Sequence, residues 1–319
     1  MRYRQLGTSG LTVSVVGLGC NNFGRVCDLE GTRAVVDAAL EDGITLLDTA
    51  DTYGNKGGSE TFLGEVLKGR RDRVVLATKF GSAMDGPEEE ARGSRRYVRR
   101  AIEASLRRLQ TDHVDLYQQH VPDPKTPLEE TVAALDELVG EGKVRYLGSS
   151  NFASWQIADA YWIARTERRS RMISAQNHYS LLERGVEEEV IPACLEHGVG
   201  MLPFFPLGSG MLTGKYRRGE PAPRGTRLAG RPHLLTDAAF ERVEALEKYA
   251  AERDRTLLEV AIGGLAAQPA VTSVISGATR PEQVRANAAA GAWEPTADDL
   301  AALDAIVPRG SSTSRRSAG

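Results

Sequence analysis

The sequence has few cysteines, almost no excess charge of either sign and no long hydrophobic run. Its 319 residues include three cysteines, Cys20, Cys27 and Cys194, too few and too scattered for a disulfide framework or a zinc site. No segment approaches the roughly eighteen apolar residues of a transmembrane helix, and the start has no apolar core of signal-peptide length. We therefore expect a cytoplasmic protein without a membrane partner or a bound metal.

The charges are balanced, with 40 basic and 43 acidic residues, a net charge of -3 and a pI near 6.1. This balance gives no reason to expect nucleic acid as a partner, and the basic run from Arg92 to Arg108 is typical of a solvated helix face. A composition with 41% hydrophobic and 26% charged residues is that of an ordinary globular protein. It leaves the oligomeric state open.

Short apolar runs alternate with stretches of helical periodicity. The strand-like runs are Val16–Gly19, Ile44–Asp48, Val74–Thr78, Val114–Gln119, Val144–Ser149, Ile173–Asn177, Gly200–Phe204 and Val271–Ser276. Helical periodicity marks Arg33–Glu41, Val98–Leu109, Leu128–Gly140, Trp155–Arg165 and Glu187–His197. Eight strands with helices between them and no linker-like break predict a single domain over residues 1–310, folded as a parallel (β/α)8 TIM barrel.

Three segments lie outside this repeat. Arg2–Gln5 and Leu11–Val15 predict an N-terminal β-hairpin, and residues 311–319 have the composition of a disordered tail. Lys215–His233, rich in Pro, Gly and Arg, predicts an extra loop covering the mouth of the barrel. A doubly wound sheet is the alternative fold, but no Gly-x-Gly-x-x-Gly opens a helix, since Gly17-Leu-Gly19 continues as Cys-Asn-Asn-Phe-Gly24.

Four polar residues, Asp48, Tyr53, Lys79 and His120, lie at or just beyond the ends of strand-like runs. In a barrel these ends share one rim, where enzymes of this fold carry their catalytic groups. A charged lysine beside a tyrosine favours the phenolate and lowers the pKa of the phenol, while a carboxylate keeps the lysine charged. Tyr53 is therefore the predicted general acid, and His120 offers an N–H to the same substrate oxygen.

Each of these residues also has an ordinary structural interpretation. Tyr53 could be a loop aromatic, Lys79 a solvated strand end, and Asp48 or His120 a cap. Four independent ordinary roles would not be expected to place all four residues on one rim. Their convergence there favours the catalytic interpretation.

The motifs around these residues resemble those of the aldo-keto reductase family, over the whole chain before the predicted tail. Leu47-Asp-Thr-Ala-Asp-Thr-Tyr-Gly54 is similar to the family signature after the second strand, and Lys79 and His120 complete its tetrad. Gly-Ser-Ser-Asn-Phe at 148–152 is similar to the stretch in which Ser150 and Asn151 hold the nicotinamide carboxamide, and Gln176 matches the third such contact. The resemblance implies a nicotinamide cofactor and a small-molecule carbonyl substrate.

Further cofactor contacts are implied by the same resemblance. Phe204 stands where the family commonly has a Tyr that stacks on the nicotinamide, and Phe205 replaces a Ser that contacts the pyrophosphate. A strand–loop–helix at the last strand resembles the adenosine site, and Arg280 favours NADPH, with NADH as the alternative. The remaining implied cofactor contacts are Gly19, Cys20, Asn21, Asp48, Pro206, Leu207, Ser209, Gly210, Lys215, Arg227, Ile275, Gly277, Thr279, Gln283 and Asn287.

Two further positions in the implied adenosine site differ from the family pattern. Ala286 replaces a common Glu of the adenine contact, and Gly277-Ala278 replaces a Lys-Ser pair that meets the 2′-phosphate in some relatives. The predicted substrate-contacting residues are Phe23, Tyr53, Phe80 and His120, with Trp155 as a further candidate wall. Specificity is expected in the loops near Asn22–Arg25, Ala83–Gly93 and Gly214–Pro232.

The leading functional hypothesis is an NADPH-dependent oxidoreductase that reduces aldehydes or ketones to alcohols. A regulatory, redox-sensing subunit is the alternative, because the family branch resembled here includes potassium-channel β subunits. Those proteins generally have Asn where this chain has His120, which favours catalysis. A third hypothesis makes Lys79 the Schiff-base lysine of an aldolase-type barrel.

Overall fold

The computed structural model of the chain describes residues 1–84 and 90–312. Its core is an eight-stranded parallel sheet in the order β10-β3-β4-β5-β6-β7-β8-β9. The strands are β3 (Val16–Gly19), β4 (Leu46–Asp48), β5 (Val75–Phe80), β6 (Val114–Gln119), β7 (Val144–Ser150), β8 (Met172–Gln176), β9 (Gly200–Met201) and β10 (Val274–Gly277). Backbone hydrogen bonds from Thr272 to Met201 (2.9 Å) and from Ile275 to Pro203 (3.1 Å) join the two edge strands. The sheet thereby closes into a barrel.

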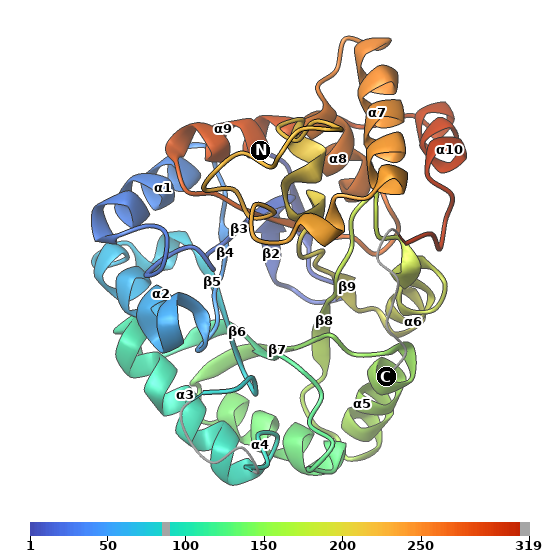
Figure 1. Cartoon of the computed structure of the whole chain (residues 1–319). Coiled ribbons are helices and arrows are strands. Elements are labelled where there is room, and N and C mark those ends of the chain that lie inside the picture. Colours follow the sequence, from blue (N-terminus) through green and yellow to red (C-terminus); the bar gives the residue numbers. More distant parts are fainter. Residues whose placement is uncertain (85–89, 313–319) are drawn as a thin grey trace.

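Helices surround this ring of strands (Figure 1). Those that follow the strands are α1 (Leu29–Glu41), α2 (Tyr53–Val66), α3 (Arg95–Leu109), α4 (Leu128–Gly140), α5 (Ser154–Thr166), α6 (Val190–His197), α8 (Leu257–Ala266) and α9 (Pro281–Ala290). Two more, α7 (Asp237–Ala251) and α10 (Ala297–Ile306), pack against each other on the outside. The predicted (β/α)8 barrel is confirmed.

The predicted N-terminal hairpin is also confirmed, as β1 (Tyr3–Gln5) paired with β2 (Thr12–Ser14). Leu6 and Val13 pack in the barrel interior with residues such as Leu116 and Leu202, and the Thr8 N–H donates to the Gly198 carbonyl (2.9 Å). These contacts attach the hairpin at the amino-terminal end of the strands. The carboxyl end is left to the βα loops.

Some strands are shorter than their apolar runs. Strand β4 begins at Leu46 instead of Ile44, because the Ser14 hydroxyl accepts the Thr45 N–H (3.0 Å) where a neighbouring strand would otherwise pair. Strand β9 ends at Met201 instead of Phe204, since Pro203 has no N–H to donate to a neighbouring strand. Strand β10 starts at Val274 instead of Val271.

The loop after β9 contains the short helices η3 (Gly208–Thr213) and η4 (Pro232–Leu234), with neither helix nor strand between them. This agrees with the predicted extra loop. Of the predicted tail, Ser311 accepts the Arg184 N–H (2.7 Å) and Ser312 pairs with Glu183, so ordered contacts continue two residues past the expected boundary. Residues 313–319 lie outside the described residues, as do 85–89 of the expected specificity loop.

The basic run on α3 is more than a solvated face. Arg95 and Arg99 form ion pairs with Glu137 of α4, and Arg108 pairs with the fully buried Glu60 of α2 (2.7 Å). These pairs join α3 to both neighbouring helices. Among residues 1–84 and 90–312, no helix combines the length and apolar character needed to cross a membrane.

Candidate active site

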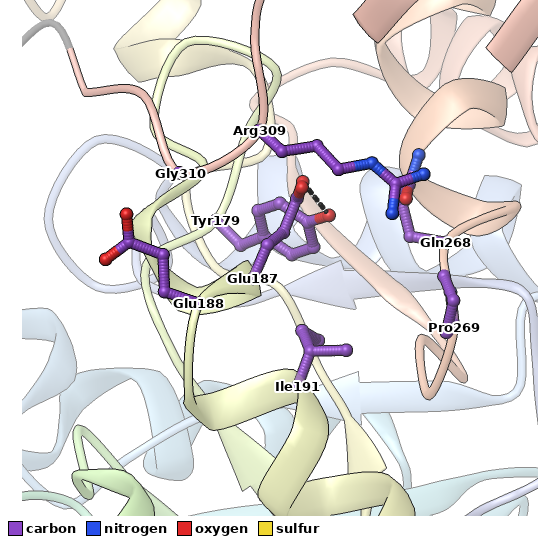
Figure 2. A pocket seen from close by; sticks show the side chains of 8 residues that line it. All are labelled: Tyr179, Glu187, Glu188, Ile191, Gln268, Pro269, Arg309 and Gly310. Carbon is purple, nitrogen blue, oxygen red and sulfur yellow. Dashed lines mark hydrogen bonds between the residues drawn. The ribbon is translucent and has the colours of Figure 1, made fainter. Parts of the chain in front are cut away.

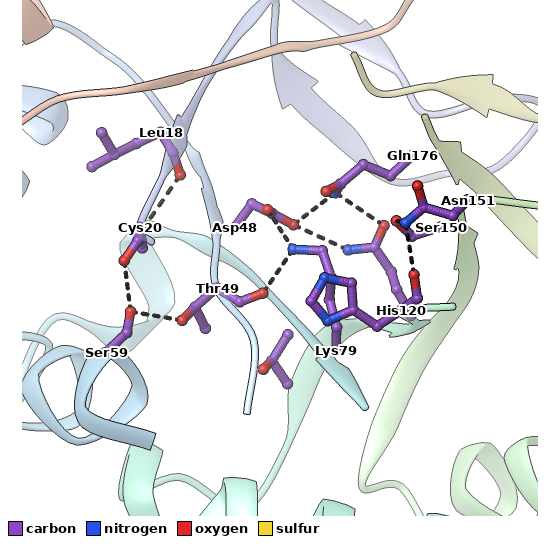
Figure 3. Close-up of polar contacts among 12 residues, drawn as sticks. Leu18, Cys20, Asp48, Thr49, Ser59, Lys79, His120, Ser150, Asn151 and Gln176 are labelled. Atoms are coloured by element: carbon purple, nitrogen blue, oxygen red, sulfur yellow. Dashed lines mark hydrogen bonds and ion pairs between the residues drawn. The ribbon is translucent and has the colours of Figure 1, made fainter. Parts of the chain in front are cut away.

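The four predicted catalytic residues converge at the carboxyl ends of adjacent strands. Figure 3 shows three of them, Asp48, Lys79 and His120. Asp48 ends β4, Lys79 lies near the end of β5, His120 directly follows β6, and Tyr53 begins α2. Parallel pairing places Asp48 opposite Ala77 and Lys79 opposite Gln118, which brings the three strand ends to one level. The structure therefore assembles the tetrad that the sequence predicts.

A buried ion pair lies at the centre of this group. Lys79 Nζ donates to Asp48 Oδ2 (2.6 Å) and to the Thr49 carbonyl (2.9 Å), and the relative exposures of the Lys79 and Asp48 side chains are 0% and 3%. Burial alone would lower the pKa of Lys79, but Asp48 and Tyr53 together raise it above its ordinary value. Lys79 is therefore a charged ammonium at neutral pH.

Tyr53 lies against this ammonium, with Lys79 Nζ 5.0 Å from the ring centroid. Burial raises the pKa of Tyr53, whereas the charge of Lys79 and its hydrogen bond lower it, and the net direction is upward. The expected lowering by Lys79 is thus present but is outweighed by desolvation. Tyr53 is protonated at neutral pH, as a proton donor must be.

His120 meets Tyr53 edge-on, with ring centroids 5.7 Å apart. Burial, and then the positive charge of Lys79, lower the pKa of His120 to about 3. The imidazole is therefore neutral near pH 7. It can donate one N–H to a substrate oxygen, but it cannot compete with Tyr53 as an acid.

Two glutamines complete the surroundings of Asp48. Gln176 Nε2 donates to Asp48 Oδ1 (2.9 Å), and so does Gln118 Nε2 (3.1 Å). Gln118 is not among the site residues predicted from the sequence. Side chains alternate along a strand, and Leu116 points into the barrel. Gln118, two residues further along β6, therefore points into the barrel as well.

A left-handed turn follows Tyr53 and fixes its position. Gly54, Asn55, Lys56 and Gly57 all have positive φ, and a Cβ on Gly54 would clash with the Phe23 carbonyl and the Ser59 N–H. The Ser59 hydroxyl donates to the Cys20 carbonyl (2.8 Å) and contacts the Thr49 hydroxyl (2.8 Å). Ser59 thus ties α2 to the segments that follow β3 and β4.

The predicted nicotinamide contacts gather at the neighbouring strand ends. Ser150 and Gln176 end β7 and β8, and Asn151 follows with a φ of 59° and donates to the His120 carbonyl (2.9 Å). Since Gln176 directs its amide nitrogen to Asp48, its oxygen is left to accept from a carboxamide. This free oxygen fits the N–H of a bound amide.

Aromatic side chains line the next part of the rim. Phe204 stacks on His178, with centroids 5.5 Å apart and planes at 10°, so only the opposite face of Phe204 can meet a nicotinamide ring. The Arg227 guanidinium lies 4.9 Å from the Phe205 ring centroid, which brings this loop residue to the site. The stacking of His178 on Phe204 had no signal in the sequence.

The segment predicted to contact the pyrophosphate contains a close approach at Gly210. Its φ is +99°, and a Cβ there would lie 2.8 Å from Lys215 Nζ. Lys215 is thereby held against η3, which also contains Ser209, while Pro206 and Leu207 directly precede that helix. The predicted pyrophosphate contacts therefore share one stretch of chain.

At the last strand, Gly277 pairs with Gly19, and the main chain of Cys20 donates to the Asp48 carbonyl (2.9 Å). Asn21 and Asn22 follow, and Asn22 donates to the Ala278 carbonyl (3.3 Å). Ile275 instead packs its side chain in the barrel interior, away from the rim.

The helix start after β10 is less open to an anion than the sequence suggests. Gln283 Oε1 already accepts the Thr279 N–H (2.8 Å), and Pro281 opens α9 without an N–H. Asn287 is buried on the same helix. Arg280 remains exposed, and no ion pair engages it within the described part of the chain, so the side chain is available to a phosphate.

Two of the predicted substrate walls are not exposed. Phe23 and Phe80 are fully buried, and Phe80 stacks on Tyr117 with centroids 4.8 Å apart. They belong to the core and cannot contact a substrate in this conformation, because other side chains cover them. Trp155, at 66% exposure, is an accessible aromatic close to the rim.

A separate cavity of about 230 Å³ lies beside α6 and the C-terminal segment (Figure 2). Its polar walls are satisfied internally, since the Tyr179 hydroxyl donates to Glu187 (2.6 Å) and Arg309 pairs with Asp304 (2.8 Å). None of the predicted site residues lines it. We therefore place the candidate active site at the rim that carries Asp48 and Tyr53.

Comparison with known proteins agrees with this geometry. The model of the aldo/keto reductase family matches residues 15–308. The chain is 39% identical over 295 residues to the uncharacterized oxidoreductase YrpG of Bacillus subtilis, with 89% of each chain covered. It is 34% identical to a probable voltage-gated potassium channel subunit beta of Arabidopsis thaliana, with 90% of each covered. It is 35% identical to L-glyceraldehyde 3-phosphate reductase of Escherichia coli, with 90% and 86% covered.

Proposed function

The chain belongs to the aldo/keto reductase family, and from this premise we propose that it reduces aldehyde or ketone carbonyls to alcohols with NADPH. The family consists of oxidoreductases that act with a nicotinamide cofactor. The observation that carries the proposal is the buried ion pair of Lys79 and Asp48 beneath a protonated Tyr53. A charged pair is costly to bury, so its presence at the rim supports a chemical role.

In the proposed reaction, Tyr53 donates its phenolic proton to the carbonyl oxygen. The Lys79 ammonium stabilises the phenolate that remains, and Asp48 keeps Lys79 charged. His120, which is neutral, donates an N–H that orients the same oxygen. NADPH, when bound, supplies the hydride that the carbonyl carbon accepts. The phenolate then recovers a proton from solvent, and the alcohol leaves.

Cofactor choice is the finer part of the proposal. Ser150, Asn151 and Gln176 would hold the carboxamide, and Lys215 and Arg227 the pyrophosphate. Arg280, exposed and free of an ion pair in the described residues, supports NADPH over NADH, because a 2′-phosphate would give it an anionic partner. We also propose a cytoplasmic location and no nucleic-acid partner.

A regulatory role is the second candidate, favoured by the relatives named as potassium channel subunits. His120 and the complete tetrad support catalysis instead. A Schiff-base role for Lys79 is disfavoured, because its raised pKa and two hydrogen bonds leave little neutral amine to attack a carbonyl.

The test is a panel of aldehydes, ketones and quinones, with NADPH consumption followed by absorbance and NADPH affinity measured by calorimetry. We expect saturable binding of NADPH without substrate, and saturable turnover with at least one carbonyl class. Binding without turnover on any class would favour the regulatory candidate. Borohydride trapping of Lys79 with a carbonyl compound would favour the Schiff-base mechanism.

A further inference from the structure

Asp48 divides its two oxygens between different partners. Oδ2 accepts from Lys79 (2.6 Å), while Oδ1 accepts from Gln118 (3.1 Å) and Gln176 (2.9 Å), as Figure 3 shows in part. Gln176 Nε2 also lies 3.3 Å from Gln118 Oε1, so the two amides and the carboxylate form a closed triangle. Because a carboxylate only accepts hydrogen bonds, both amides must turn their nitrogen toward it.

All members of this triangle are inside the barrel. Gln118 is 0% exposed and Gln176 and Asp48 are each 2% exposed. Burying an amide costs free energy unless hydrogen bonds replace its water. An apolar residue would fill the position of Gln118 at lower cost, as Leu116 does one layer deeper on the same strand face. The amide therefore indicates a role that depends on its N–H.

We propose that Gln118 is a positioning residue that holds the Asp48 carboxylate with Oδ2 toward Lys79 and moderates the negative charge facing Tyr53. This rests on the proposed reduction. Without the Gln118 donor, Gln176 alone would hold Oδ1, and Asp48 would be freer to rotate and share both oxygens with Lys79. Its charge would also be less compensated where it opposes the phenolate.

The consequence for Tyr53 has a definite sign. The charge of Asp48 raises the pKa of Tyr53, and an amide donating to Asp48 weakens that effect. Removing the donor should therefore raise the pKa of Tyr53 further. The other titratable groups facing Tyr53 are Lys79, His120, Cys20 and Arg227, and a substitution of Gln118 changes none of these residues.

The experiment compares Gln118→Met, which keeps the volume and removes the donor, with Gln119→Met on the same strand. Gln119 is 2% exposed, alternates to the opposite face and makes no hydrogen bond to the tetrad in the described structure. NMR of tyrosine labelled at Cζ, with Tyr53 assigned through Tyr53→Phe, gives the titration midpoint without cofactor or substrate. The falling limb of kcat against pH gives the second readout.

We expect the Tyr53 midpoint of Gln118→Met to rise by about one unit, and the kcat limb to move in the same direction. At neutral pH kcat should fall about three- to tenfold, with the Kd for NADPH unchanged, and Gln119→Met should match wild type. Should Gln118→Met not fold, Gln118→Asn, which withdraws the donor by one methylene, should show the same direction of shift.

An unchanged midpoint in a folded Gln118 variant overturns the inference, as does an equal shift in Gln119→Met. The proposed reduction fails separately. If wild type reduces no carbonyl but the midpoint still rises in Gln118→Met, the positioning of Asp48 by Gln118 stands and the reaction is wrong. If wild type is active and the midpoint does not move, the reaction stands and the inference is wrong.

Discussion

The ring of His120 meets the ring of Tyr53 edge-on, with centroids 5.7 Å apart and planes at 81°. His120 is neutral because burial and the charge of Lys79 lower its pKa to about 3. Tyr53 stays protonated because burial raises its pKa. The pair therefore offers an N–H and an O–H to the same point at the barrel rim. Two donors converging on one oxygen suit a carbonyl group.

This geometry predicts the product from an α,β-unsaturated aldehyde. His120 and Tyr53 should hold the carbonyl oxygen, so the carbonyl carbon receives the hydride and the C=C bond stays intact. The expected product is the allylic alcohol, identified by NMR after enzymatic reduction. A saturated aldehyde as the main product would rule out this orientation of the substrate.

A second prediction concerns pH and stability. Burial, and then the charge of Glu60, raise the pKa of Asp51 from 3.8 to about 7. The folded protein therefore holds this proton more tightly than the unfolded chain does. The resulting stability is complete below about pH 4 and is lost as the pH rises through about 7.

Asp51→Asn should remove this dependence. Between about pH 5 and about pH 8, wild type should lose up to about 3 kcal/mol of unfolding free energy relative to the variant. Urea denaturation at both pH values measures the difference. Parallel curves for the two proteins would mean that Asp51 titrates normally in the folded state.

Substitution of Gly54 should strongly destabilise the fold, because an added methyl would clash with neighbouring atoms and the backbone has a positive φ. Gly54→Ala should cost roughly 2–5 kcal/mol, because the new methyl meets the Phe23 carbonyl and the Ser59 N–H at a positive φ. Gly142→Ala is the matched control, since its φ is +73° but nothing lies within 4 Å of a Cβ there. That variant should lose only about 1–2 kcal/mol. Equal losses in thermal unfolding would contradict the steric argument.

Arg280 should decide the choice of dinucleotide. Arg280→Gln is expected to lower kcat/KM for NADPH about tenfold or more while leaving NADH little changed, because only NADPH carries a phosphate for the guanidinium. Arg285→Gln is the control, since Arg285 is paired with Glu41 (3.4 Å). Steady-state kinetics with both cofactors measures this, and a wild type that prefers NADH would refute the assignment.

The barrel and the tetrad were predictable from the sequence because both depend on local signals. Strand-like runs ending in Asp48, Lys79 and His120 place those side chains on one rim by the rule for parallel strands. The inward direction of Gln118 was also predictable, because side chains alternate along β6 and Gln118 lies two residues before His120.

Other features depend on packing that no local pattern encodes. Phe23 and Phe80 look like pocket walls in sequence, yet contacts with other elements, such as the stacking of Tyr117 on Phe80, bury them. The direction of the Tyr53 pKa likewise depends on how deeply the ring is buried, which outweighs the Lys79 charge that the sequence does reveal. The early end of β9 at Met201, shortly before Pro203, is the opposite case, since the missing N–H of a proline is visible in the sequence.

The most direct test of the proposed reduction is the rate of a single turnover in Tyr53→Phe, with the Kd for NADPH measured on the same protein. The substitution removes only the hydroxyl, so fold and NADPH affinity should match wild type. The rate of carbonyl reduction should fall by roughly 10²–10⁴, the usual contribution of a positioned acid. A near-native rate in a variant that binds NADPH normally would contradict the account, because another group would then be donating the proton.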